Sequence, residues 1–368
     1  MPLYDLPLWA CDAEQFPDDG IHGQGWRAAA KKIPVPSFGD EVFDEYLSSM
    51  RERYPGYTPT YLCDPKSDDK SRAAPQIYIE ARSRIAAQRA FDLIRASLMI
   101  IDGCPLLFID DQLVIPQDLE NLEDLTKYDL RPGGRTARAR YDVFLATKIA
   151  AKLSRRRYLQ YAAYKLQQSL LTASADYMDL QPNYYRKQFY VANHPHHHVQ
   201  MSTAITLAYS AIEELHLEPR PIDSKPIKLP NGSWEPLALA SLNNRLEKAG
   251  IDLKASLVWT VRGSPTRIDK SRRAPSGNKQ SWSRGLVRDK AVTIQDALVA
   301  SSWMRSRCTT HRYTEETKSI SMFDVHNVQF LVRRLLLERI GIWKYFSRRD
   351  PASTQRRAKA RILTKYLV

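Results

Sequence analysis

Apolar side chains recur at helical spacing along much of the chain. They appear every three or four residues in 79–102, 141–173, 201–217, 294–308 and 323–340, as expected of amphipathic helices. The most regular of these stripes consists of Met201, Ala204, Ile205, Ala208, Ala211, Ile212 and Leu215. The pattern therefore predicts a mainly α protein built as an extended helical bundle.

The last two stripes form a predicted helical hairpin. Thr293 and Asp296 have the spacing of a capping box, so a helix is expected to begin there. Ser321 and Asp324 repeat this signal, and Gly341 is suited to end the second helix. The first stripe contains Ile294, Ala297, Leu298, Ser301, Met304 and Cys308, and the second contains Val325, Val328, Val332, Leu335 and Leu336.

Shorter segments interrupt the helical pattern. Residues 1–78 are rich in proline, aromatic residues and aspartate, which predicts an irregular N-terminal arm. Two short apolar runs within 106–115 predict a small β-hairpin, and 255–261 predicts a strand. Residues 236–246 predict a short helix inside an insertion at about 220–290.

These elements define three parts of the chain. The arm at 1–78 precedes a helical domain at 79–346, which carries the insertion. Residues 347–368 are strongly basic and predict a C-terminal helix or tail. The total of 368 residues suffices for one large or two ordinary domains.

The overall charge of the chain indicates what kind of partner the protein binds. A net charge of +14 and an isoelectric point near 9.5 indicate an acidic partner, with nucleic acid first among the candidates. No apolar run approaches the roughly 20 residues of a membrane span, and the first residues lack a signal-peptide pattern. Four cysteines without paired spacing are typical of free thiols in a reducing compartment. We therefore expect a cytoplasmic protein without membrane contact.

The candidate chemistry lies at the end of the first hairpin helix. An arginine fork binds a phosphate through two hydrogen bonds, and a histidine can transfer a proton near neutral pH. Arg305 and His311 are six residues apart, about 120° from a shared face in an unbroken helix, so they converge only if the helix ends first. Arg307 and His311 are four apart and share a face. Alternatively, His311 only complements the helix dipole and both arginines are solvated.

The segment Arg305-Ser-Arg-Cys-Thr-Thr-His311 resembles the motif of the HEPN superfamily of helical ribonucleases and nucleotide-binding domains. That family carries an arginine, four to six residues and a histidine at the end of one bundle helix, with another apolar helix following. The resemblance covers about Tyr141 to Phe346 with a large insertion. It implies a metal-independent endoribonuclease, often a homodimer, that uses 2′-hydroxyl attack to give a 2′,3′-cyclic phosphate. An acidic residue, Glu213 or Glu214, would orient the catalytic arginine.

The same resemblance implies a biological setting. HEPN relatives suggest antiviral defence or a toxin–antitoxin system, with an antitoxin or an effector complex as partner. Fold analogy alone does not establish function. A non-catalytic RNA- or DNA-binding subunit is the alternative, and a helical scaffold whose charge only aids solubility is a third.

Two further basic segments are candidates for nucleic-acid contact. Arg155 and Arg156 lie in the middle of the predicted 141–173 helix, and residues 262–290 mix cations with an aromatic residue as single-strand binders do. A solvated helix face and a solvated loop are the competing interpretations. The candidates in the second segment are Arg272, Arg273, Lys279, Trp282 and Arg284.

A histidine cluster at His194 to His198 invites a metal interpretation. Consecutive histidines do not share a helix face, and no nearby carboxylate or cysteine completes a ligand set. We therefore expect no metal and no other cofactor.

Overall fold

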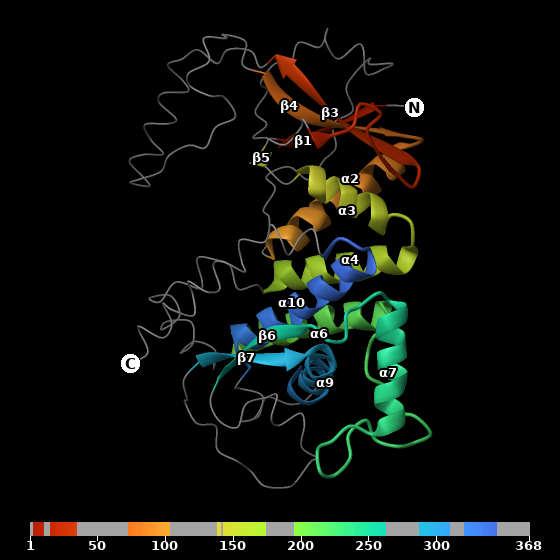
Figure 1. Cartoon of the computed structure of the whole chain (residues 1–368). Coiled ribbons are helices and arrows are strands. Elements are labelled where there is room, and N and C mark those ends of the chain that lie inside the picture. Colours follow the sequence, from red (N-terminus) through yellow and green to blue (C-terminus); the bar gives the residue numbers. More distant parts are fainter. Residues whose placement is uncertain are drawn as a thin grey trace. The chain divides into compact units, whose positions relative to one another are not determined.

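A computed structural model describes residues 3–10, 15–34, 73–103, 138–140, 143–173, 195–262, 287–309 and 320–343 (Figure 1). These residues form two compact units. The first contains Met1–Leu98 and Leu107–Arg155, and the second contains Met99–Leu106 and Arg156–Val368. The described part is mainly helical, which confirms the predicted fold class.

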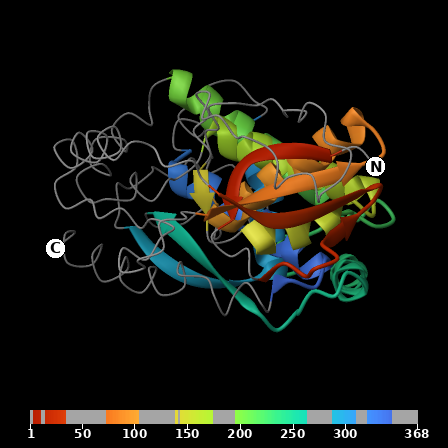
Figure 2. The same cartoon turned by 90° about the horizontal axis from the view of Figure 1, so that it is seen from above.

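The first unit contains a five-stranded sheet with the order β2-β3-β4-β1-β5. Figure 2 shows its long strands, in red and orange, running side by side. Neighbouring strands are antiparallel except β1 and β5, which are parallel. The strands are β1 (Leu3–Ala10), β2 (Ile21–Gly23), β3 (Trp26–Pro34), β4 (Ala73–Ala81) and β5 (Arg138–Arg140).

This sheet corrects the prediction of an irregular arm for the residues that form β1 to β4. Prolines exclude helices, but they are tolerated at strand ends and at bulges. Pro34 is the last residue of β3, and Pro7 lies between Asp5 and Trp9, where the pairing register of β1 shifts. Several residues of these strands are buried: Tyr4, Trp26, Ala28, Ile77, Tyr78 and Ile79.

Helix α2 (Arg84–Asp102) begins later than the predicted residue 79, because β4 continues to Ala81. The Ser83 hydroxyl accepts a hydrogen bond from the Ala86 N–H at 3.2 Å and caps the helix. Gly103 has φ +70°, a conformation that ends a helix at little cost for glycine. The predicted stripe is buried at Ala87, Ala90, Phe91, Ile94 and Leu98.

The predicted helix 141–173 is two helices, α3 (Val143–Leu153) and α4 (Arg157–Thr172). The Ser154 hydroxyl donates to the Ala151 carbonyl at 2.8 Å and accepts from the Gln24 N–H at 2.9 Å. Arg156 has φ −140° and ψ 126°, which is extended backbone. Local bonding by serine and this extended residue therefore end α3 and separate it from α4.

The second unit is a bundle in which α6 (Pro195–Glu214) packs against α4, α9 (Ile294–Met304) and α10 (Met322–Arg339). The seven apolar residues predicted for the 201–217 stripe are all buried. Inside the bundle, the Ser169 hydroxyl donates to the Ala204 carbonyl at 2.7 Å and accepts from the Gln329 side chain at 2.9 Å. The insertion adds α7 (Pro236–Lys248) and the antiparallel pair β6 (Ser256–Arg262) and β7 (Val287–Thr293).

The predicted hairpin signals are confirmed. The Thr293 hydroxyl accepts from the Asp296 N–H at 3.2 Å, and the Asp324 carboxylate accepts from the Ser321 N–H at 2.9 Å. Gly341 has φ +71° and follows α10 closely. Both predicted apolar stripes are buried, apart from Cys308, whose side chain is not described. The predicted hairpin at 106–115 and the tail at 347–368 lie outside the described residues.

Among the described residues, each helix is too short or too polar to span a bilayer.

Candidate functional site

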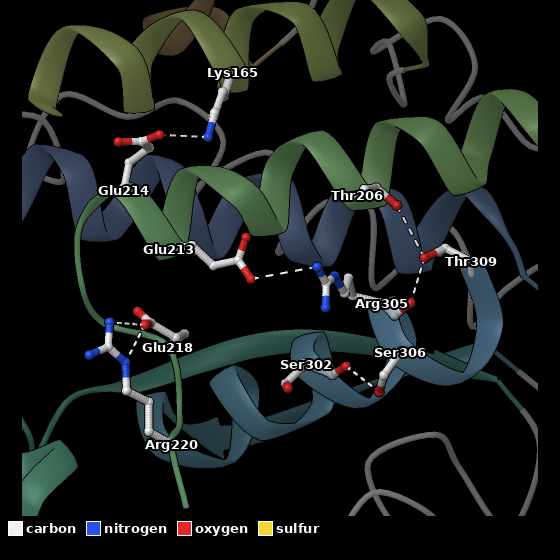
Figure 3. Close-up of polar contacts among 10 residues, drawn as sticks. All are labelled: Lys165, Thr206, Glu213, Glu214, Glu218, Arg220, Ser302, Arg305, Ser306 and Thr309. Atoms are coloured by element: carbon white, nitrogen blue, oxygen red, sulfur yellow. Dashed lines mark hydrogen bonds and ion pairs between the residues drawn. The ribbon is translucent and has the colours of Figure 1, made fainter. Parts of the chain in front are cut away.

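The candidate arginine lies where the α-helical geometry of α9 changes. The chain continues from Met304 into a single π-helical turn, η3 (Arg305–Thr309). Two hydroxyl groups of this turn donate to backbone carbonyls four residues earlier, as Figure 3 shows. Ser306 donates to the Ser302 carbonyl at 2.8 Å, and Thr309 donates to the Arg305 carbonyl at 2.6 Å. The α-helix therefore ends before position 311, as convergence of Arg305 and His311 requires.

Arg305 pairs with a carboxylate from α6. Its Nη2 atom lies 3.8 Å from Oε1 of Glu213 (Figure 3). The two side chains are 41% and 37% exposed, so solvent and ligands can reach the pair. The guanidinium carbon also lies 5.8 Å from the ring centroid of Tyr209, within cation–π range. A guanidinium oriented from two sides in this way can still bind a phosphate with its other donors.

The structure separates the two glutamates that the sequence left as alternatives. Glu214 bonds to Lys165 of α4 with a 2.7 Å separation between Oε1 and Nζ. Adjacent residues on a helix point about 100° apart, so only one of the two can meet η3. Glu213 is that residue.

Two further α6 residues contact the turn and were missed by the sequence analysis. The Thr206 hydroxyl donates to the Thr309 hydroxyl at 3.1 Å. Tyr209 is buried, and burial raises the pKa of its phenol, although a hydrogen bond with Ser302 opposes the shift. Thr206, Tyr209 and Glu213 are three and four residues apart, so they share one face of α6. A polar stripe at this spacing was the available signal.

The other predicted catalytic residues are placed only in part. Arg307 is exposed in η3, and His311 lies outside the described residues. The structure therefore brings Arg305 and Glu213 together and gives no position for His311.

Only some of the residues predicted to contact nucleic acid lie in the described part of the chain. Arg155 and Arg156 are exposed between α3 and α4, with Arg155 in the first unit and Arg156 in the second. Arg156 Nη1 donates to the Tyr158 hydroxyl at 3.4 Å. The candidates between 272 and 284 lie outside the described residues.

Three residues of the histidine cluster, His196, His197 and His198, lie in the first turn of α6, whereas His194 lies outside the described residues. Pro195 opens α6, and proline suits the first position of a helix because its missing N–H would have no partner there. His198 is buried and lies beside Ser202, 3.4 Å from its hydroxyl, while His196 and His197 are exposed. Within the described ranges, there is no group of three metal-ligating side chains.

Comparisons of the chain with protein-family models, with curated proteins and with solved structures find no match.

Proposed function

We propose that this protein is a metal-independent endoribonuclease of HEPN type that acts on RNA. The observation that supports the proposal is the Arg305–Glu213 pair, half exposed at the end of one bundle helix and formed with the preceding bundle helix. The HEPN resemblance implies an acidic residue in this role. His311 follows Thr309 by two residues, and two residues span at most about 7 Å, so the proposal needs no long excursion of the chain.

The proposed reaction uses His311 for proton transfer and Arg305 for stabilising negative charge on the phosphate. The ribose 2′-hydroxyl oxygen attacks the adjacent phosphorus, the bond from phosphorus to the 5′-oxygen breaks, and the products carry a 2′,3′-cyclic phosphate and a 5′-hydroxyl. His311 would take the proton from the 2′-hydroxyl or give one to the leaving oxygen. Arg305, helped by Arg307, would neutralise the charge that develops on the phosphate oxygens. Glu213 would hold the Arg305 fork in place.

The decisive experiment measures cleavage of mixed RNA in excess EDTA. Wild-type protein is compared with His311→Ala and Arg305→Ala, all purified in parallel. We expect cleavage by the wild type, products ending in a cyclic phosphate, and losses of roughly 100- to 10,000-fold in His311→Ala. His22→Ala is the matched control, because His22 lies in β2 with a side chain that is 61% exposed.

Equal cleavage by wild type and His311→Ala would remove His311 from the mechanism. Salt-sensitive RNA binding without any cleavage, unchanged in His311→Ala, would instead favour the non-catalytic binding subunit. Negligible affinity for RNA and DNA at ~150 mM salt would leave only the scaffold.

A further inference from the structure

Three arginines and two tyrosines lie together where α4 begins and α10 ends. We call them the Tyr158 cluster: Arg156, Arg157, Tyr158, Tyr161 and Arg339. Two guanidinium groups bond to one phenol oxygen. Arg156 Nη1 lies 3.4 Å from the Tyr158 hydroxyl, and Nε and Nη2 of Arg339 each lie 3.3 Å from it. Arg157 lies over the Tyr161 ring at 5.5 Å from the centroid and donates to its hydroxyl at 3.3 Å.

In the part of the chain that the structure describes, the arginines of this cluster bond to uncharged groups: the two phenols and, for Arg339, also the Lys248 carbonyl. Across the described ranges, none of its three arginines forms an ion pair with a carboxylate. Arginines elsewhere in the described residues do, as in the pairs Arg27–Glu80, Arg220–Glu218, Arg305–Glu213 and Arg334–Glu338. Holding two guanidinium groups on one neutral oxygen costs repulsion that a bound anion would relieve.

The phenol itself is suited to an anion. Burial alone would raise the pKa of Tyr158, but hydrogen bonds and charge from Arg339 and Arg156 outweigh it and lower the pKa. In its neutral form the phenol keeps one O–H group. Its oxygen accepts from the arginines, and its O–H remains a donor for a phosphate oxygen.

The cluster lies at the same end of α6 as the Arg305 pair. The Tyr158 ring is 6.4 Å from the ring of His216, which follows α6 by two residues. Glu213, the partner of Arg305, lies three residues before His216 in the last turn of the helix. In Figure 1, the start of α4 and the end of α6 lie on the same side of the bundle.

We propose that the Tyr158 cluster is a phosphate-binding site that holds the backbone of a single-stranded RNA outside the Arg305 centre. Arginines would bind successive phosphates, and the Tyr161 ring, 45% exposed, offers a surface for a base. The choice of RNA as the ligand rests on the proposed function. The binding itself does not depend on cleavage.

The test uses a fluorescent, fully 2′-O-methylated RNA of mixed sequence, which cannot be cleaved by 2′-hydroxyl attack. Binding is measured by anisotropy in the full chain over a series of salt concentrations. The variant is Arg156→Gln with Arg157→Gln, since both side chains are exposed and their replacement leaves the core intact. The matched control is Arg84→Gln with Arg89→Gln, which removes the same charge from exposed positions on α2.

We expect the cluster variant to bind about tenfold more weakly than wild type at ~100 mM salt, with the slope of log affinity against log salt reduced by about 1.4, or roughly 0.7 for each lost contact. The control should match wild type. Equal binding by both double variants would overturn the proposal, and so would tighter binding of wild type to duplex RNA than to the single strand. Recruitment of wild type to anionic lipid vesicles through these arginines, without RNA binding, would assign the cluster to a membrane surface instead. Absent cleavage with the expected binding pattern would refute the nuclease alone.

Discussion

Replacing Glu213 by glutamine tests whether Arg305 must be held in place. The substitution removes one charge and keeps the size and shape of the side chain. Glutamine can still accept one hydrogen bond through its amide oxygen, but it does not attract the guanidinium group electrostatically. If the proposed function is correct, Arg305 then samples orientations in which its fork does not face the phosphate.

The solvent exposure of the Arg305–Glu213 pair limits how much Glu213→Gln can lower the stability of the protein. Two unit charges 3.8 Å apart interact by about 1 kcal/mol in water, and exposed pairs are worth about 0–1 kcal/mol after side-chain ordering. Because the two side chains are 41% and 37% exposed, we expect Glu213→Gln to lower the free energy of unfolding by less than about 1 kcal/mol. The melting temperature should fall by no more than about 4 °C.

The effect on cleavage should be larger than the effect on stability. Misplacement of a reacting or charge-stabilising group by about 1 Å can cost roughly 100-fold in rate. We expect kcat to fall by about 10- to 100-fold, which corresponds to about 1.4–2.7 kcal/mol of lost transition-state stabilisation. KM should stay constant or fall, because the unpaired Arg305 remains positive and still attracts RNA.

The adjacent residue provides the control. Glu214→Gln changes a residue of the same helix and removes its ion pair with Lys165 of α4, in which both side chains are 31% exposed. This variant loses the same charge as Glu213→Gln, but the side chain at position 214 points toward α4 and not toward η3. Cleavage of a fluorescent RNA and thermal unfolding are measured for both variants. Equal kcat values for the two variants would refute a positioning role for Glu213.

Two other predictions concern polar residues of the bundle helices. Thr206→Val removes the 3.1 Å bond to Thr309 and should cost about 1 kcal/mol of stability, with a larger proportional loss of cleavage. Burial raises the pKa of Glu338 although Arg334 opposes the shift, so the folded state holds the proton more tightly than the unfolded state. The contribution of Glu338 to wild-type stability is therefore fully present below the ordinary glutamate pKa of about 4.3 and is lost as the pH rises through the raised pKa. In urea unfolding, the stability of Glu338→Gln relative to wild type should therefore increase as the pH rises above about 4.

Each of these predictions has a control or a contradictory outcome. Thr203→Val changes an exposed threonine on the same helix and should leave cleavage unchanged. If Thr206→Val behaves like Thr203→Val, the bond to Thr309 has no part in the site. A stability difference between Glu338→Gln and wild type that stays constant with pH would contradict the raised pKa.

The helices of the bundle were predictable because their signals are local. The stripe on α6 and the caps at Thr293 and Ser321 depend on residues within a few positions of one another. The sheet was not predictable in this way, since β3 pairs with β4 across almost 40 intervening residues. The break between α3 and α4 also depends on a distant group, because Ser154 accepts its hydrogen bond from Gln24. Apolar periodicity alone runs through such a break.

The candidate site was also only partly predictable from local sequence. The arginine and the end of its α-helix follow from the segment 294–309, whereas the choice between Glu213 and Glu214 depends on how α6 is rotated in the bundle. That rotation is set by the buried apolar stripe of the opposite face. The apolar stripe of α6 therefore also determines the direction in which its polar side chains point. It does not determine which residues those polar side chains contact.

The polar face of α6 explains how an unusual turn can persist at the end of α9. A π-helical turn is rare and often occurs at functional sites, which implies that surrounding contacts must offset its cost. In η3, the first and last residues, Arg305 and Thr309, both contact α6, through Glu213 and Tyr209 at one end and Thr206 at the other. The turn is therefore held at both of its ends by one rigid helix. If the proposed function is correct, this frame holds the Arg305 guanidinium in a fixed place relative to Thr309, the last described residue before His311.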